Sequence, residues 1–219
     1  MKKLVVIIVI FSLMVFASSC KNELSLEMYL SQNRSVAYVS VSENYTLTVY
    51  GEEREDPFIS DGFVGTQKKF ITVRLEDYKQ SLDDARVFLS FNGITLEGKF
   101  EYSPLNGKFT TEIQTESLPT DNQIVAVIKN AGEETTLTLS SFTAENSIDY
   151  KSALNSVTKT AGKEINKMLE GNGSIEVRLR KIAQSNRLYY YVSVIDKSGN
   201  TLAYLVDGES GNVLASKSF

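Results

Sequence analysis

The stretch that decides the fold is ARVFLSFNGITLEGKFEY, residues 85–102. Aromatic and aliphatic residues recur on both sides of Asn92-Gly93, and such residues favour a pleated, half-buried strand. An Asn-Gly pair between two such runs favours a type I′ turn, because both central residues of that turn need positive φ. The sequence therefore predicts a β-hairpin with strands over Ala85–Phe91 and Ile94–Tyr102.

The same pattern continues in both directions, from Val36 to about Phe142. Alternating or short apolar runs, broken by turn residues, predict further strands at Val36–Val41, Tyr45–Tyr50, Phe58–Val64, Phe70–Leu75, Lys108–Thr115, Gln123–Lys129 and Thr135–Ser141. About seven to nine short strands at this spacing are typical of a β-sandwich. We interpret residues 36–146 as an N-terminal β-sandwich domain, immunoglobulin-like by strand count alone.

The rhythm changes at Ser147. Apolar residues at three- and four-residue steps predict a helix with one buried stripe, made of Leu154, Val157, Ala161, Ile165, Met168 and Leu169. Asp149 or Ser152 is expected to cap the start of this helix, and Gly171-Asn172-Gly173 to end it. Strands are predicted after it at Ser174–Ala183, Leu188–Asp196, Thr201–Val206 and Val213–Ser216. Residues 147–219 thus predict a small α+β unit, one helix packed on an antiparallel three- to four-stranded sheet.

Two motifs in this tail resemble the PepSY family. They are YYVSV, residues 190–194, and above all YLVDGESGNVL, residues 204–214. Asp207 can accept bonds from the following backbone N–H groups, and Gly211 can take positive φ. The resemblance implies a PepSY-like α+β domain at 147–219. The family is associated with peptidase propeptides and with inhibition.

The first twenty residues have the three parts of a secretory signal. Lys2 and Lys3 give a positive start, residues 4–16 are apolar apart from one serine, and the small residues 17–19 precede Cys20. The apolar run is shorter than the roughly 20 residues that a spanning helix needs.

The placement of Cys20 resembles the lipobox of bacterial lipoproteins, although Ala17 is less common than leucine three positions before the cysteine. The resemblance implies a signal peptide at 1–19, cleavage between Ser19 and Cys20, and a diacylglycerol thioether on Cys20. Residues 20–35 are then a lipid-anchored tether or, alternatively, a first structured element. An ordinary cleaved signal with a chance cysteine is the other interpretation.

Composition excludes several chemistries. The chain has no histidine and one cysteine, so histidine-based triads, His-ligated zinc, Cys₄ zinc and an internal disulfide are impossible within it. The net charge of −4 becomes about −6 without Lys2 and Lys3, which disfavours nucleic acid. We expect no catalytic residue, metal or cofactor, and no motif points to one ligand. Acidic runs at 52–56 and 83–84 are interpreted as solvated loops.

The sequence favours a non-enzymatic, lipid-anchored binding or accessory module of the bacterial cell envelope. It would sit outside the cytoplasm, held to a membrane by the lipid on Cys20, with an envelope protein or peptide as its partner. A regulator or inhibitor of an envelope peptidase, acting through the PepSY-like domain, is the alternative. A carboxylate or Ser/Lys enzyme is the least favoured interpretation.

Overall fold

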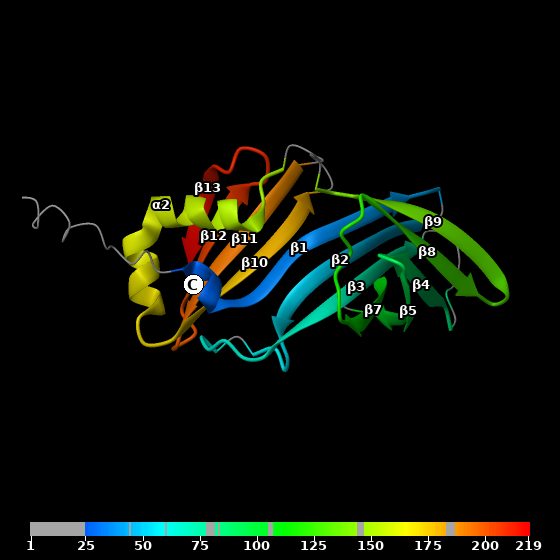
Figure 1. The fold of residues 1–219 in the computed structure, drawn as a ribbon, viewed down its shortest axis with the longest axis horizontal. Coiled ribbons are helices and arrows are strands. Elements are labelled where there is room, and N and C mark those ends of the chain that lie inside the picture. The colour runs from blue at the N-terminus through cyan, green and yellow to red at the C-terminus, as the bar shows by residue number, and fades with distance from the viewer. Residues whose placement is uncertain are drawn as a thin grey trace, which may run out of the picture.

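The computed structural model describes residues 25–43, 45–59, 61–77, 82, 84–104, 107–143, 147–182 and 187–219. The predicted signal peptide 1–19, the bond between Ser19 and Cys20, and residues 20–24 lie outside these ranges. Figure 1 shows a long twisted sheet with one bent helix at one end. The elements are η1 Leu26–Tyr29, β1 Leu30–Val41, β2 Tyr45–Glu55, β3 Gln67–Asp77, β4 Arg86–Phe91, β5 Ile94–Lys99, β6 Glu101–Ser103, β7 Lys108–Thr115, β8 Gln123–Asn130, β9 Glu133–Ser141, α2 Tyr150–Leu169, β10 Gly173–Ile182, β11 Arg187–Asp196, β12 Thr201–Asp207 and β13 Val213–Ser218.

All these strands belong to one hydrogen-bonded sheet of 13 strands. Its main path runs β13-β12-β11-β10-β1-β2-β3-β7-β6. β9 pairs with the end of β1 beyond β10, on the edge opposite β2, and β8, β4 and β5 follow β9 in that order. The prediction of a mainly β chain is confirmed. Pairing is antiparallel throughout this path except between β1 and β10, which run parallel.

Strands β1 to β9 form what we call the closed half. β5 pairs with β4 and β6 pairs with β7, and only Phe100 separates β5 from β6. β5 and β6 follow one another without pairing, so the chain itself links the two ends of the strand order, and the sheet, which returns to β1 through β4, β8 and β9, is barrel-like. Its core gathers side chains from across these strands, among them Leu47, Val73, Leu89 and Leu139. An immunoglobulin-like sandwich is not confirmed by this topology.

The hairpin from which the fold was inferred is confirmed. Phe91 pairs with Ile94, and the two residues between them, Asn92 and Gly93, have φ of 47° and 76°. Both central residues are therefore left-handed, as a type I′ turn requires.

The strand boundaries differ most around residues 50–66. β2 continues to Glu55, beyond the predicted end at Tyr50, because Glu52 is paired with Arg34 and Gln32 of the neighbouring strand β1. The predicted strand Phe58–Val64 is wrong, since its described residues form a loop in which Gly62 has a φ of 81°. We call residues 56–66 the β2–β3 loop.

Strands β10 to β13 and α2 form what we call the helix half. The predicted helix is present, and the Asp149 side chain accepts a hydrogen bond from the Ser152 N–H at 2.8 Å. Non-helical backbone at Ala161 bends α2, which keeps both of its arms against the sheet (Figure 1). Buried residues of the helix, such as Leu154 and Ile165, pack on β10, β11 and β12.

Strand β1 belongs to both halves. Its start, Leu30–Arg34, pairs with β10, and Tyr38 and Val39 pair with β9. Residues 26–35, for which the sequence left a tether or a structured element open, thus lie in η1 and β1, and Leu26 is buried in the core of the helix half.

Candidate functional site

Positive charge gathers on the sheet face that α2 leaves uncovered. Ile175, Val177 and Leu179 of β10 face the helix, so the alternation of a strand turns Arg178 and Arg180 to the opposite side. Arg34 and Arg74 of neighbouring strands lie close enough to act on the charge of Arg180, so they share its face. Of the seven arginines in the chain, the five on what we call the arginine face are Arg34 of β1, Arg54 of β2, Arg74 of β3, and Arg178 and Arg180 of β10.

Tyr50 of β2 lies at the centre of the arginine face. The guanidinium carbons of Arg34 and Arg74 lie 5.2 Å and 5.3 Å from its ring centroid, one from each neighbouring strand. Arg54 lies in the same way over Phe70, at 4.1 Å. Aromatic rings attract guanidinium groups, so these contacts favour the observed positions of the three arginines.

Buried carboxylates neutralise part of this charge. Glu52, which is 2% exposed, accepts hydrogen bonds from Arg34 Nε and Gln32 Nε2, both at 2.8 Å. Gln32 in turn accepts from Arg178 Nε at 2.5 Å. A hydrogen-bonded chain therefore crosses from β10 through β1 to β2. It links the strands of the two halves where they meet.

The outer parts of the network pair in the same way. Arg178 forms an ion pair with Glu176 at 2.8 Å, and Arg54 forms one with Glu112 of β7 at 2.7 Å. Three carboxylates thus face five guanidinium groups. Arg74 and Arg180 make no ion pair within the part of the chain that the structure describes.

The electrostatics at Arg180 reflect this excess of positive charge. Partial burial, followed by the charge of Arg34, lowers the pKa of the Arg180 guanidinium below its usual value. Arg178 and Arg74 act in the same direction. A nearby anion would relieve this repulsion, so the arrangement favours binding one.

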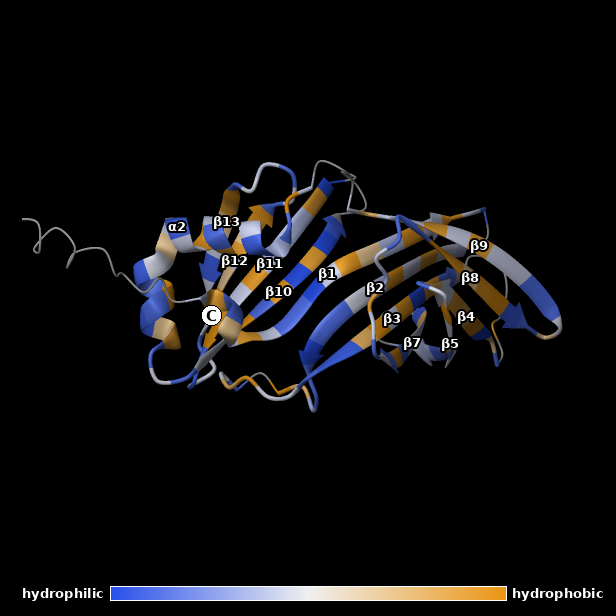
Figure 2. Cartoon of the chain, in the orientation of Figure 1, coloured by the Kyte–Doolittle hydropathy of each residue, from blue (hydrophilic) through white to orange (hydrophobic). Residues whose placement is uncertain are grey.

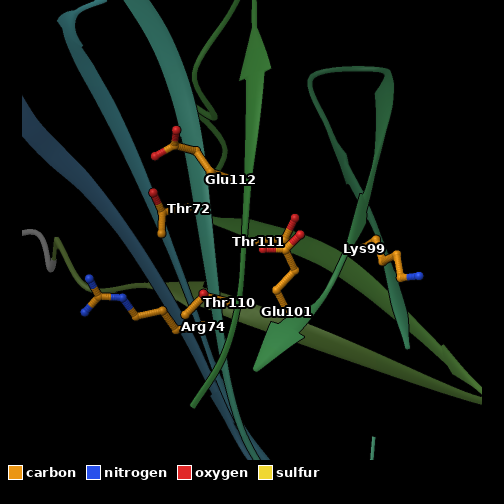
Figure 3. Close-up of a pocket in the computed structure, with 7 residues that line it drawn as sticks. All are labelled: Thr72, Arg74, Lys99, Glu101, Thr110, Thr111 and Glu112. Atoms are coloured by element: carbon orange, nitrogen blue, oxygen red, sulfur yellow. The ribbon is translucent and has the colours of Figure 1, made fainter. Parts of the chain in front are cut away.

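A polar hollow of about 460 Å³ adjoins Arg74. Figure 3 shows residues from β3, β5, β6 and β7 around it, with Arg74 and Lys99 at opposite ends. Hydroxyl groups of Thr72 and Thr110 lie between the strands near Arg74. Beside Arg74 the hollow adds Lys99 and threonine hydroxyls as hydrogen-bond donors, and the carboxylates of Glu101 and Glu112 also line it.

The acidic runs considered from the sequence have different places. The solvated-loop interpretation of residues 52–56 is wrong for Glu52 and Glu55, which are buried in β2. Asp84 is exposed and forms an ion pair with Lys99, whereas Asp83 lies outside the described residues. No group of three or more His, Cys, Asp or Glu residues that could hold a metal ion occurs in the described ranges.

The turn quoted for the PepSY resemblance has the expected hydrogen bonds. Asp207 accepts from the backbone N–H groups of Ser210 and Glu209, at 2.8 Å and 3.2 Å, and Gly211 has a φ of 74°. The Ser210 backbone N–H is the main reason that the pKa of Asp207 lies below its usual value. Arg187 contributes through an ion pair at 3.2 Å.

Sequence reasoning missed the arginine face. One local pattern could have indicated it: Arg178 and Arg180 flank buried Leu179, which puts two cations on the solvent side of a strand. Arg34, Tyr50 and Arg74 carried no such pattern, because only pairing between distant strands brings them together.

Among the residues that the structure describes, no helix is both long and apolar enough to cross a membrane. A scan against models of known protein families finds no match to this chain, and a search of curated proteins finds no relative.

Proposed function

We propose that this chain is a bacterial lipoprotein that works without catalysis, as a binding module of the cell envelope, and that its arginine face takes an acidic segment of an envelope protein or peptide. One observation carries the ligand assignment. Five arginines lie on one sheet face, three of them over Tyr50 or Phe70, while only three carboxylates among the described residues pair with them.

Carboxylates are the favoured ligand because the face already binds them. Glu52, Glu176 and Glu112 occupy three of the arginines, with distances of 2.7–2.8 Å to Arg34, Arg178 and Arg54. Arg74 and Arg180 extend this series with guanidinium groups that lack such a partner among the described residues. Planar guanidinium groups match carboxylates through paired N–H donors.

The proposal is tested by titrating the mature protein in non-ionic detergent with fluorescein-labelled hexaglutamate and reading anisotropy. Arg74→Gln and Arg180→Gln should each weaken binding by roughly tenfold, the value of one charge-assisted hydrogen bond. Added salt should weaken it further, since Arg180 is exposed and Arg74 is only half-buried.

Arg86→Gln is the matched control. Arg86 pairs with Glu97 on exposed strands of the closed half, away from Tyr50. An Arg86→Gln protein that lost as much affinity as Arg180→Gln, or binding that ignored salt, would exclude the arginine face as the site.

The location is proposed from the resemblance at the N-terminus. A diacylglycerol thioether on Cys20, formed after cleavage behind Ser19, would hold the folded part to the outer face of a membrane in the envelope. Mass spectrometry of the native N-terminal peptide should find the acylated cysteine, and Cys20→Ser should release the protein from membranes. An unmodified thiol, or unchanged membrane attachment, would contradict the anchor.

The alternative is regulation of an envelope peptidase by a PepSY-like unit at 147–219. Its support is the Asp207 turn together with a helix on four antiparallel strands. Because β10 pairs with β1, the test uses the whole chain and not the isolated unit. The protein should slow casein hydrolysis by an envelope extract and Asp207→Ala should slow it less; equal rates with and without protein count against regulation.

A finer fold assignment belongs with these proposals. The closed half can be regarded as a flattened, immunoglobulin-like sandwich, with β1, β2, β3 and β7 opposite β4, β5, β8 and β9. The support is a single apolar core to which both sets of strands contribute.

A further inference from the structure

One end of the sheet carries an unusual share of exposed apolar side chains. β1 begins there, β2 ends and β3 begins there, and the β11–β12 turn and the C-terminus lie beside them. We call this the tether end. Of the ten large hydrophobic residues that are exposed in the described ranges, five lie on it: Met28, Ile59, Phe63, Val64 and Phe219. Figure 2 shows orange segments in the β2–β3 loop, at the same end as η1.

Contacts hold the β2–β3 loop in place without burying its apolar side chains. Gly65 donates its backbone N–H to Glu55 at 2.6 Å, and Asp56 donates to Thr66 at 3.0 Å. Gly62 approaches the β11–β12 turn so closely that a Cβ there would lie 2.7 Å from the Asp196 carbonyl oxygen. This contact fixes the loop while Phe63 remains 52% exposed.

The predicted anchor lies close by in the sequence. Cys20 is five residues before Ser25, where the described chain begins just ahead of η1. Five residues of fully extended chain reach at most about 18 Å. A lipid on Cys20 would therefore keep Ser25, just ahead of η1, within about that distance of the bilayer surface.

We propose that the tether end lies directly on the bilayer that holds the lipid of Cys20, with Phe63, Ile59 and Met28 inserted at the level of the headgroups. This inference rests on the lipoprotein assignment and goes beyond it, because an anchored protein could also hang free of the surface. Exposed apolar side chains gathered on one rim are what an interfacial contact requires.

Charge does not drive this contact. Lys68 pairs with Asp56 at 2.5 Å, and Lys151 pairs with Glu27 of η1 at 3.0 Å. The proposed contact rests on the apolar side chains, so it should form on zwitterionic lipid.

The chain has no tryptophan, which allows a single reporter. The lipidated full-length protein carrying Phe63→Trp is reconstituted into phosphatidylcholine vesicles with brominated acyl chains. Tyr102→Trp is the matched control. Tyr102 is a similarly exposed aromatic residue of β6, which pairs with β7 beside the end of β3 that lies away from the tether end. Flotation of the vesicles reports anchoring separately.

The proposal predicts that tryptophan emission from the Phe63→Trp protein moves to shorter wavelength and is quenched several-fold more than emission from the Tyr102→Trp protein. Protein that floats with equal quenching in both variants would overturn the bilayer contact and leave the anchor intact. Protein that does not float would contradict the anchor, and the contact with it. A shift in the Phe63→Trp protein that depends on protein concentration and not on bromine would mean that a second copy covers the tether end instead.

Discussion

The closed half and the helix half share one sheet but bury it by different means. The closed half curls round until its strands face one another across a core that contains Leu47 and Leu89, with no helix among its described residues. The helix half stays open and lays α2 over one face only. Its other face would expose a flat strand surface, and charged networks around Glu52 and Glu176 occupy the junction there.

This difference explains where the candidate site lies. A closed sheet has its interior filled with apolar side chains, whereas an open sheet covered on one face has a second face left for other uses. The arginine face lies where β10 of the helix half meets β1, β2 and β3. Buried polar side chains, among them Gln32, Glu52 and Glu176, occupy this face of the junction.

The strongest test of the comparison is to truncate one core at a time. Ile165→Ala in the helix half and Leu89→Ala in the closed half should each cost about 2–5 kcal/mol of unfolding free energy, because both side chains are fully buried. Urea unfolding followed by circular dichroism should remain one transition in both variants, since β1 contributes to both cores. Two separate transitions, with Ile165→Ala shifting only one, would show that the halves are independent.

Comparing the stability of the Glu52→Gln and Glu112→Gln variants tests whether the charged network joins the two halves. Removing the Glu52 charge leaves Arg34 nearly buried without its partner and should cost about 3 kcal/mol. Glu112 pairs with Arg54 at the surface, so its replacement should cost about 0.2–1 kcal/mol. Thermal unfolding measures both; similar losses would mean that the network does not join the halves.

The Asp207 turn makes the helix half sensitive to acid. Because folding lowers the pKa of Asp207, its stabilisation is fully present above the unfolded value of about 3.9 and is lost as pH falls through the lower folded value. Asp207→Asn should cost about 1–2 kcal/mol near pH 7 and progressively less below pH 4. Urea midpoints across this range test it, and a pH-independent difference would contradict the account.

Two buried tyrosines under α2 should respond differently to loss of the hydroxyl. Tyr190 Oη donates to the Ile148 carbonyl at 3.0 Å, so Tyr190→Phe should cost about 1 kcal/mol. Tyr204 Oη is buried without a hydrogen-bond partner among the described residues, so Tyr204→Phe should be neutral or slightly stabilising. Urea unfolding of the two variants measures both effects, and equal losses would contradict this assignment.

The same two tyrosines should limit the stability of the protein at alkaline pH. Burial raises the pKa of Tyr190 and of Tyr204 to about 12. Because folding raises these pKa values, the folded state is unaffected below the ordinary value of about 10 and loses stability as pH rises toward 12. Each Phe variant should flatten the fall in melting temperature over this range. An unchanged slope would mean that the phenols ionise freely in the folded protein.

Local features could be predicted from the sequence because local residues determine them. Asn92-Gly93 sets its hairpin through positive φ, and Asp149 caps α2 through one hydrogen bond to Ser152. The extension of β2 to Glu55 could not be predicted, because Glu52 is stabilised by Arg34 and Gln32 on another strand.

Closure of the sheet and formation of the arginine face depend on contacts between residues that lie still farther apart in the sequence. Arg178 reaches Gln32 across 146 residues, and the parallel pairing of β1 with β10 joins the first strand to the strand that follows α2. No periodicity in one strand encodes which other strand will lie beside it. The partners of a polar strand face therefore appear only once the topology is known.

The central claim is that the excess positive charge of the arginine face binds an acidic peptide at the junction of the two halves. The most direct measurement is a ¹H–¹⁵N NMR titration of the protein with hexaglutamate. The account predicts the largest shifts at Arg34, Tyr50, Arg74 and Arg180, with little change in α2 or β8. Shifts confined to the Asp207 turn or to α2, with the arginine face unmoved, would contradict it.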